Sequence, residues 1–278
     1  MNVSLDQGQS VNEIIEPVNR YFHNPIAASI VKILKNTWVT PDLITYISIF
    51  IGLVSAYFFS SGTMQSFFLA VILLEIVMVL DCVDGQLARA KKCVSDWGRL
   101  LDGIAGYIIY LAILVGIMIG LGKYYGMLVV IGTLTILRAI TYDYCKLTMI
   151  TMIQKGYDGN QEEILNTYLK VSKNASIIFK VYLYYLQFQQ FIFCGHFANP
   201  DQFDKNNILT FSQRKNYWKK NRTLMIVWSW NGVDLPIFLL VLISIFGVLD
   251  FFLKPLACLL VLQFVLTMVY HRMQYSIT

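Results

Sequence analysis

Long apolar runs, separated by short polar breaks, constrain this sequence more than any other feature. A helix needs about 20 mostly apolar residues to cross a hydrocarbon core of about 30 Å. Six runs of about this length cover residues 43–60, 63–80, 101–121, 124–145, 223–249 and 256–275. Because lipid offers no hydrogen-bond partners to backbone groups, such runs predict transmembrane helices. We therefore expect an all-α, polytopic integral membrane protein with about six transmembrane helices.

Composition supports this class. Of the 278 residues, 56% are hydrophobic and 14% are charged, whereas soluble domains carry about 25% charged residues. The five cysteines, at positions 82, 93, 145, 194 and 258, form no CxxC pair, so we expect neither a disulfide framework nor a zinc site. The first 36 residues lack the uninterrupted apolar core of a cleaved signal peptide. In a membrane protein the positions of the charges along the chain matter more than the net charge of +5, so no nucleic-acid partner is expected.

The distribution of basic residues predicts the orientation of the helices. If the N-terminus is cytoplasmic, the links near residues 61, 123 and 252 lie outside. Of the 22 Lys and Arg residues, only Lys123 and Lys254 then fall outside. Lys and Arg accumulate in cytoplasmic segments of membrane proteins. We therefore expect the N-terminus, the C-terminus and the active site to be cytoplasmic.

Four segments are expected along the chain. Residues 1–38 form a cytoplasmic region, because residues 10–37 carry apolar positions at the spacing of a juxtamembrane amphipathic helix. Residues 39–154 hold transmembrane helices 1–4, and residues 223–278 hold helices 5 and 6. Between them, residues 155–222 are expected to be a cytoplasmic or interfacial insertion. The insertion ends in a basic, aromatic cluster that suits an anionic membrane surface.

Three aspartates cluster at the predicted end of the second span and the start of the third. Asp81 and Asp84 are three residues apart and share one helix face. Asp102, on the next span, can approach them. An acid at membrane depth costs about 2.5–3.5 kcal/mol, so three together favour a bound cation. Carboxylate ligands favour Mg²⁺ or Mn²⁺, which commonly bridges carboxylates to substrate phosphates.

Small residues and one arginine surround these carboxylates. Gly85 and Ala88 remove side-chain bulk beside the acids, which lets a nucleotide or phosphate approach the backbone, and Arg89 can clamp phosphate oxygens. Gly98 and Gly106 lie four residues on either side of Asp102 and share its helix face. These residues predict a pocket for a phosphate or diphosphate.

The pattern resembles the signature of the CDP-alcohol phosphotransferase (CDP-alcohol phosphatidyltransferase) family, DxxDGxxAR, eight residues, then GxxxDxxxD. Seven of the eight positions match. They are Asp81, Asp84, Gly85, Ala88, Arg89, Gly98 and Asp102. Thr40-Pro41-Asp42 also resembles the family's Thr-Pro-Asn before its first span. The resemblance covers the transmembrane domain, and no residues of the 155–222 insertion can be mapped onto it.

The resemblance implies an activity and a ligand set. Enzymes of this family transfer a phosphoalcohol group, phosphatidyl or headgroup, from a CDP-alcohol donor to an acceptor hydroxyl and release CMP, as in phospholipid biosynthesis. The resemblance implies that the metal, Mg²⁺ or Mn²⁺, is bound by Asp81, Asp84 and Asp102. It implies that the donor contacts Gly85, Ala88, Arg89 and Gly98. It also implies that membrane lipid is a partner and that the protein is a homodimer.

Position 106 departs from the signature. The family's fourth aspartate, which helps to bind metal and to deprotonate the acceptor, is Gly106 here. Glycine can do neither through a side chain, so the catalytic base is not assigned. Either another acid reaches the acceptor, the acceptor supplies its own base, or the protein binds CDP-alcohol with impaired catalysis.

Other polar residues in the apolar runs have two interpretations each. Glu75 is either a functional acid or a hydrogen-bonded structural one. Arg138 is predicted to contact the acceptor or phosphate, with a simple ion pair to Asp143 as the alternative. Asp143 and Asp234 are candidates for a substitute base, with a helix kink expected at Pro236. Asp81, Asp84 and Asp102 could alternatively form structural ion pairs. Besides a transferase and a CDP-alcohol-binding protein, a transporter is a third possible function, although no internal repeat supports it.

Overall fold

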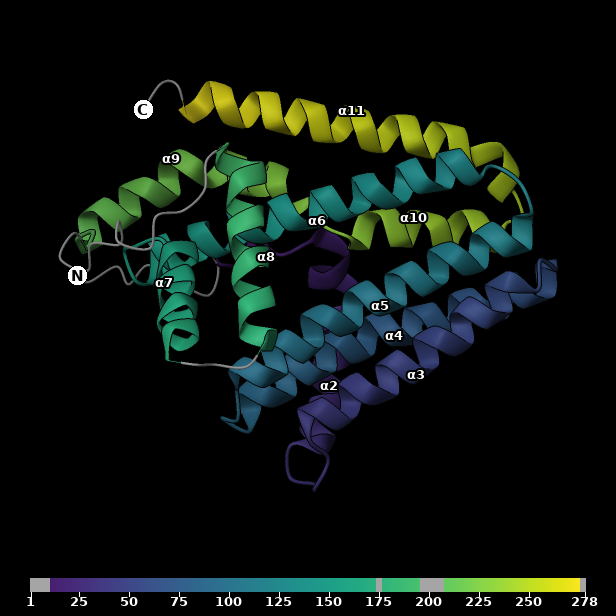
Figure 1. Cartoon of the computed structure of the whole chain (residues 1–278), viewed down its shortest axis with the longest axis horizontal. Helices are drawn as coiled ribbons and strands as arrows, with labels where there is room; N and C mark the ends of the chain where they lie inside the picture. The colour runs from purple at the N-terminus through teal and green to yellow at the C-terminus, as the bar shows by residue number, and fades with distance from the viewer. Residues whose placement is uncertain (1–10, 174–176, 196–207, 276–278) are drawn as a thin grey trace. The chain divides into compact units, whose positions relative to one another are not determined.

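The computed structural model describes residues 11–173, 177–195 and 208–275, and every regular element in these ranges is helical (Figure 1). A π-helical turn, η1 (Asn19–His23), leads into α2 (Asn24–Leu34). The helices that follow are α3 (Pro41–Ser60), α4 (Met64–Ala90), α5 (Asp96–Leu121), α6 (Tyr125–Gln154), α7 (Gly159–Ser172), α8 (Ile177–Cys194), α9 (Phe211–Ser229), α10 (Asp234–Ile245) and α11 (Leu249–Tyr275).

Six segments in the described ranges are long and apolar enough to cross a membrane. They are Pro41–Ser60, Met64–Ala90, Leu100–Leu121, Tyr125–Gln154, Phe211–Ile245 and Phe251–Gln274. The prediction of an all-α, polytopic integral membrane protein is confirmed. The four-segment organisation and the cytoplasmic orientation stay predictions.

The fifth span differs from its expected form. A single helix over residues 223–249 with a kink at Pro236 was expected, but α9 ends at Ser229 and α10 starts at Asp234. Proline lacks a backbone N–H and is tolerated in the first turn of a helix. Pro236 therefore lies in the first turn of α10. The basic cluster at 214–222 belongs to α9, so the expected boundary of the insertion at residue 222 falls inside a helix.

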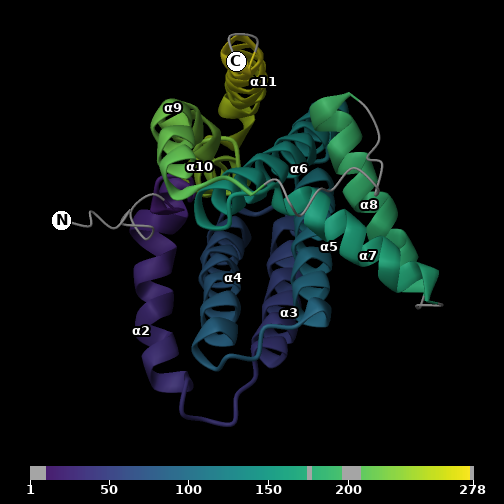
Figure 2. The ribbon, with the colours of Figure 1, turned by 90° about the vertical axis from the view of Figure 1, so that its left-hand side faces the viewer.

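The chain divides into two compact units, which are described in turn. The motif unit comprises Pro17–Thr135 and Asp234–Leu262, and the second unit comprises Met1–Glu16, Ile136–Val233 and Gln263–Thr278. In the motif unit, α3 packs against both α4 and α5, and α2 packs along α4 (Figure 2). Phe59, Leu74 and Ile117 are fully buried in its core.

Hydroxyl side chains begin the three helices that carry the motif. Thr40 caps α3 by accepting from Leu43 N at 3.2 Å, and Ser95 caps α5 by accepting from Gly98 N at 2.9 Å. Thr63 caps α4 in the same way. Each cap satisfies a backbone donor that has no partner within the helix. The caps at Thr40 and Ser95 thus define the starts of α3 and α5, the two helix starts that lie at the candidate site.

The predicted juxtamembrane helix is found as α2, but its buried face differs from the expected one. Ala27 and Val31 are buried against α4, whereas the apolar residues Ile26 and Ile33 of α2 are 40% and 73% exposed. His23 is buried beside α4 and shares a 3.1 Å hydrogen bond with Glu75. α2 therefore packs on α4 through Ala27 and Val31, with Ile30 and Leu34 partly buried beside them.

In the second unit, the start of the described chain is attached to α6 and α9. Ile14 is buried, and its carbonyl oxygen accepts from the Tyr142 hydroxyl at 2.7 Å. Arg222 of α9 donates twice to Glu13, from Nε at 3.0 Å and from Nη2 at 2.8 Å. The basic cluster of α9 thus makes specific protein contacts through Arg222.

Candidate active site

The candidate site lies where the start of α3, the end of α4 and the start of α5 meet. Asp84 of α4 is only 5% exposed, although it is an acid. Its Oδ2 accepts a 2.6 Å hydrogen bond from the Thr45 hydroxyl of α3. A buried carboxylate needs hydrogen bonds or a counter-charge to offset lost hydration. Asp81, three residues earlier on α4, is exposed.

Asp102 brings a second helix into the site. It is exposed on the second turn of α5 and is close enough to Asp84 to act on its charge. Like charges at short range repel one another, and a cation between them removes the repulsion. Arg89, one turn after Gly85 on α4, also acts electrostatically on Asp84. The structure thus places Asp102 and Arg89 within electrostatic range of Asp84. Their roles in ligand binding stay predictions.

The glycines of the motif have distinct surroundings. A side-chain Cβ at Gly85 would lie 3.6 Å from Arg89 Nη1, so the guanidinium lies over this small residue. A Cβ at Gly98 would lie 3.1 Å from Ser95 Oγ and 3.5 Å from Asp42 Oδ1. Gly98 therefore lets the first turn of α3 approach the first turn of α5.

Gly106 borders open space. No described atom outside its own helix turn lies within 4 Å of a Cβ built at this position, and the residue is exposed. An aspartate here would meet no clash and would share a helix face with Asp102. Position 106 therefore has room for an aspartate, and the carboxylate is missing because the residue is glycine.

The carboxylates fit a hard divalent cation by their chemistry. Among the described side chains, no three His, Cys, Asp or Glu groups already have the arrangement of a metal site. The donors offered by Asp81, Asp84 and Asp102 are nevertheless all oxygens, the type that Mg²⁺ and Mn²⁺ prefer. Because Asp84 is buried beside a second acid, a bound cation would neutralise the repulsion between the two negative charges. Metal binding by these three residues stays a prediction.

Thr45 is a site residue that sequence reasoning missed. It lies three positions after Asp42 and shares a helix face with it. It is also 5% exposed. A polar residue one turn inside an apolar run, beside Thr40-Pro41-Asp42, was the available signal. It could not be interpreted without knowing which residue of α4 it would meet.

Arg138, predicted to bind substrate, lies in the second unit and is fully buried. Its Nη2 donates to the Trp230 carbonyl at 2.9 Å and to Gln263 Oε1 at 3.2 Å, and Glu16 acts on its charge. At the break between α9 and α10, the Trp230 carbonyl thus accepts from Arg138 and also from Gln263 Nε2, at 2.8 Å. Substrate contact by Arg138 stays a prediction.

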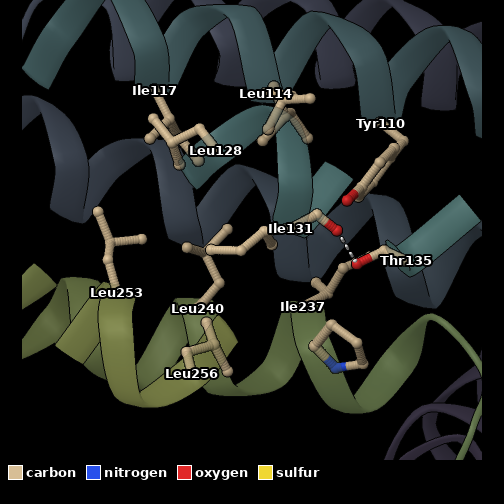
Figure 3. Close-up of a pocket in the computed structure, with 12 residues that line it drawn as sticks. Tyr110, Leu114, Ile117, Leu128, Ile131, Thr135, Ile237, Leu240, Leu253 and Leu256 are labelled. Carbon is tan, nitrogen blue, oxygen red and sulfur yellow. Dashed lines mark hydrogen bonds between the residues drawn. The ribbon is translucent and has the colours of Figure 1, made fainter. Parts of the chain in front are cut away.

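A small cavity lies deeper in the motif unit, among α5, α6, α10 and α11 (Figure 3). Its volume is about 40 Å³, and leucine and isoleucine side chains form most of its wall. Tyr110, one turn after Gly106, meets Thr135 at one end. A cavity of this size and lining does not suit a nucleotide. The polar junction of α3, α4 and α5 remains the better site for a diphosphate.

Comparison with known proteins identifies the family. Residues 38–198, more than half of the chain, match the model of the CDP-alcohol phosphatidyltransferase family. The chain is 37% identical over 89 residues to an archaetidylinositol phosphate synthase of Pyrococcus horikoshii, covering 32% of this chain and 46% of that protein. It is 33% identical over 87 residues to a bifunctional IPC transferase and DIPP synthase of Thermococcus kodakarensis, covering 31% of this chain and 19% of that protein.

These matches span less than half the length of either relative. The family match, in contrast, includes α3, α4 and α5 with every residue of the candidate site. The expected family is thereby confirmed. The chain belongs to the CDP-alcohol phosphatidyltransferase family.

Proposed function

We propose that this protein transfers a phosphoalcohol group from a CDP-alcohol to the hydroxyl of an acceptor and releases CMP. The observation that carries the proposal is the buried Asp84 carboxylate of α4, which accepts from Thr45 and lies within electrostatic range of Asp102 of α5. Two acids in this arrangement favour a cation, and a cation beside Arg89 favours an anionic diphosphate. Family membership over residues 38–198 supports the same substrate class.

Each site residue has a role in this proposal. Asp81, Asp84 and Asp102 would hold Mg²⁺ or Mn²⁺, which when bound neutralises the diphosphate and stabilises the departing CMP. Arg89 binds phosphate oxygens. The small residues Gly85, Ala88 and Gly98 admit the nucleotide.

In the transfer itself, the acceptor oxygen forms a bond to the phosphorus that carries the alcohol. The bond from that phosphorus to the CMP oxygen breaks, and CMP leaves with the bonding electron pair. The acceptor hydroxyl loses its proton. Because position 106 is glycine, this protein must pass that proton to another group, either a second acid or the acceptor itself.

The proposed location is a cytoplasmic membrane face. The excess of Lys and Arg in the segments assigned to that side supports it. The lipid could enter as the donor, as CDP-diacylglycerol, or as the hydroxyl acceptor. One relative is named as an archaetidylinositol phosphate synthase, so inositol phosphate belongs among the acceptors to be tested.

The test is CMP release by the purified full chain in lipid nanodiscs, with Mg²⁺ or Mn²⁺, a panel of CDP-alcohols and mixed acceptors. CMP release is expected to need the metal and to be lost in Asp84→Asn. Glu163→Gln is the matched control, because it removes an acid from α7 that hydrogen-bonds to Tyr182 in the second unit. CMP release that persists in Asp84→Asn would refute the assigned site.

A second candidate function is CDP-alcohol binding without turnover. The observation in its favour is Gly106, which offers no carboxylate at the position of the family's fourth aspartate. In this case the protein retains metal-dependent CDP-alcohol binding but releases no CMP with any acceptor. Binding and CMP release measured on the same preparation separate the two functions.

A further inference from the structure

We propose that Thr45 is a positioning residue that orients the Asp84 carboxylate for metal binding. The inference rests on the proposed function, because it assigns Asp84 to a divalent metal. It adds a residue of α3, outside the acidic signature, to the machinery of the site. Its chemistry is that of a hydroxyl donor to a metal-binding carboxylate.

The hydrogen-bond geometry identifies the acceptor of the Thr45 proton. Thr45 Oγ1 lies 2.6 Å from Asp84 Oδ2 and 3.3 Å from the Pro41 carbonyl oxygen. A hydroxyl has one proton to donate. The shorter distance falls in the range of about 2.5–2.7 Å for O–H···O⁻ bonds. Thr45 therefore donates to the Asp84 carboxylate.

Burial makes this bond consequential. Thr45 and Asp84 are each 5% exposed, so bulk water cannot readily replace a lost hydroxyl donor. Partners that hydrogen-bond to a metal ligand orient it, and their loss typically weakens metal affinity about 10- to 100-fold. Without Thr45, the Asp84 carboxylate loses the side-chain hydroxyl that donates to its Oδ2.

A structural alternative has a direct comparison within α3. Ser55 lies on the same buried face as Thr45 and also bridges α3 to α4, where its hydroxyl donates to the Ala70 carbonyl at 2.8 Å. Ser55 contacts backbone, whereas Thr45 contacts a carboxylate of the site. If Thr45 only joins the two helices, Thr45→Val and Ser55→Ala should have the same effects. If it positions Asp84, only Thr45→Val should change metal binding.

The experiment measures Mn²⁺ affinity by electron paramagnetic resonance on the full chain in nanodiscs. Four proteins are compared: wild type, Thr45→Val, Thr45→Ser and Ser55→Ala. We expect Thr45→Val to weaken Mn²⁺ binding about 10- to 100-fold. Thr45→Ser keeps the hydroxyl and should remain within about threefold of wild type. Ser55→Ala should leave Mn²⁺ affinity unchanged. Thermal unfolding without metal checks that each variant is folded.

The outcomes separate this inference from the proposed function. Wild-type Mn²⁺ binding that Thr45→Val retains in full would overturn the role of Thr45 and leave the proposed function intact. Equal losses in Thr45→Val and Ser55→Ala would also overturn it, in favour of helix packing. If Thr45→Val fails to fold, weak Mn²⁺ binding by a folded Thr45→Ser would overturn it, because the hydroxyl is still present. Absence of Mn²⁺ binding in wild type would overturn both proposals.

Discussion

At the scale of single residues, the acids of the site differ in burial although they share one signature. Asp84 is enclosed and bonded to Thr45, while Asp81 and Asp102 are exposed. A buried carboxylate loses hydration and needs hydrogen bonds or a counter-charge, whereas an exposed carboxylate stays hydrated. The site thus has one buried acid and two exposed acids. In the proposed function, these three acids would hold the metal at the diphosphate of the CDP-alcohol.

Gly106→Asp is expected to raise CMP release. The position has open space, and the new carboxylate would lie one turn from Asp102. A positioned general base contributes about 10²- to 10⁴-fold to a rate, so an increase in this range is expected if the wild type lacks a base. The measurement is steady-state CMP release with Mg²⁺ and a productive donor and acceptor.

Gly103→Asp is the matched control for this change. A Cβ at Gly103 also meets no described neighbour within 4 Å, and the residue lies on the same helix. It points about 100° away from Asp102 around the helix axis. If both variants release CMP equally, or if Gly106→Asp is no faster than wild type, position 106 does not account for the missing base.

At the scale of helices, close contact between α3 and α5 depends on glycine. A Cβ at Gly120 would overlap the Phe59 carbonyl oxygen, and a Cβ at Gly116 would overlap the Ala56 carbonyl oxygen. Small residues allow helix backbones to approach in membranes, where packing replaces the hydrophobic effect as a driving force. This contact fixes α5 against α3 and so helps to position the start of α5 at the site.

Gly120→Ala is therefore expected to destabilise the protein. Overpacking of this kind costs about 1–3 kcal/mol in the free energy of unfolding. Gly103→Ala, which adds the same methyl group to open space on α5, should be neutral or slightly stabilising. Unfolding in mixed micelles by sodium dodecyl sulfate measures both. Equal stability of the two variants would show that the α3–α5 contact can relax without loss.

Sequence reasoning found the helices better than it found their ends. Long apolar runs predicted six spans, and six segments of suitable length and composition are present in the described chain. The start of α9 was missed, although Thr210 and Gln213 form a capping box that a Thr-x-x-Gln pattern can reveal. The basic residues that follow outweighed this signal. At the break at 230–233, Arg138 and Gln263 donate to the Trp230 carbonyl, and no local pattern encodes these contacts.

In the candidate site, too, local features were predictable and tertiary contacts were not. The signature spacing predicted that Asp84 and Asp102 lie close together, because both positions are set by helix periodicity within adjacent spans. Thr45 is 39 residues from Asp84 in sequence, and only the packing of α3 on α4 brings them together. Residues that serve a site through tertiary contacts therefore escape analysis of a single sequence.

At the scale of the whole molecule, the orientation in the membrane is open to a direct prediction. Cys93 is exposed in the link between α4 and α5, and Lys123 is exposed in the link between α5 and α6. These links are separated by one predicted span, so they should face opposite sides. The charge distribution predicts that Cys93 lies inside and Lys123 outside.

Labelling of intact cells with a membrane-impermeant maleimide tests this orientation. Two single-cysteine proteins are compared, one that keeps native Cys93 and one that carries Lys123→Cys, with all other cysteines changed to serine. Lys123→Cys should react in intact cells, whereas Cys93 should react only after permeabilisation. The two single-cysteine proteins control for each other. The reverse labelling pattern would place the active site on the outer face, and equal labelling of both would contradict a span between them.

The most direct test of the central claim is equilibrium binding of a cytidine-labelled CDP-alcohol to the purified full chain in nanodiscs, with and without Mn²⁺. The proposed site predicts saturable binding that requires the metal, survives Glu163→Gln and is lost in Asp84→Asn. Binding that is indifferent to Mn²⁺ and to Asp84, or no binding under any condition, would contradict the assignment of the α3–α4–α5 junction as a CDP-alcohol site.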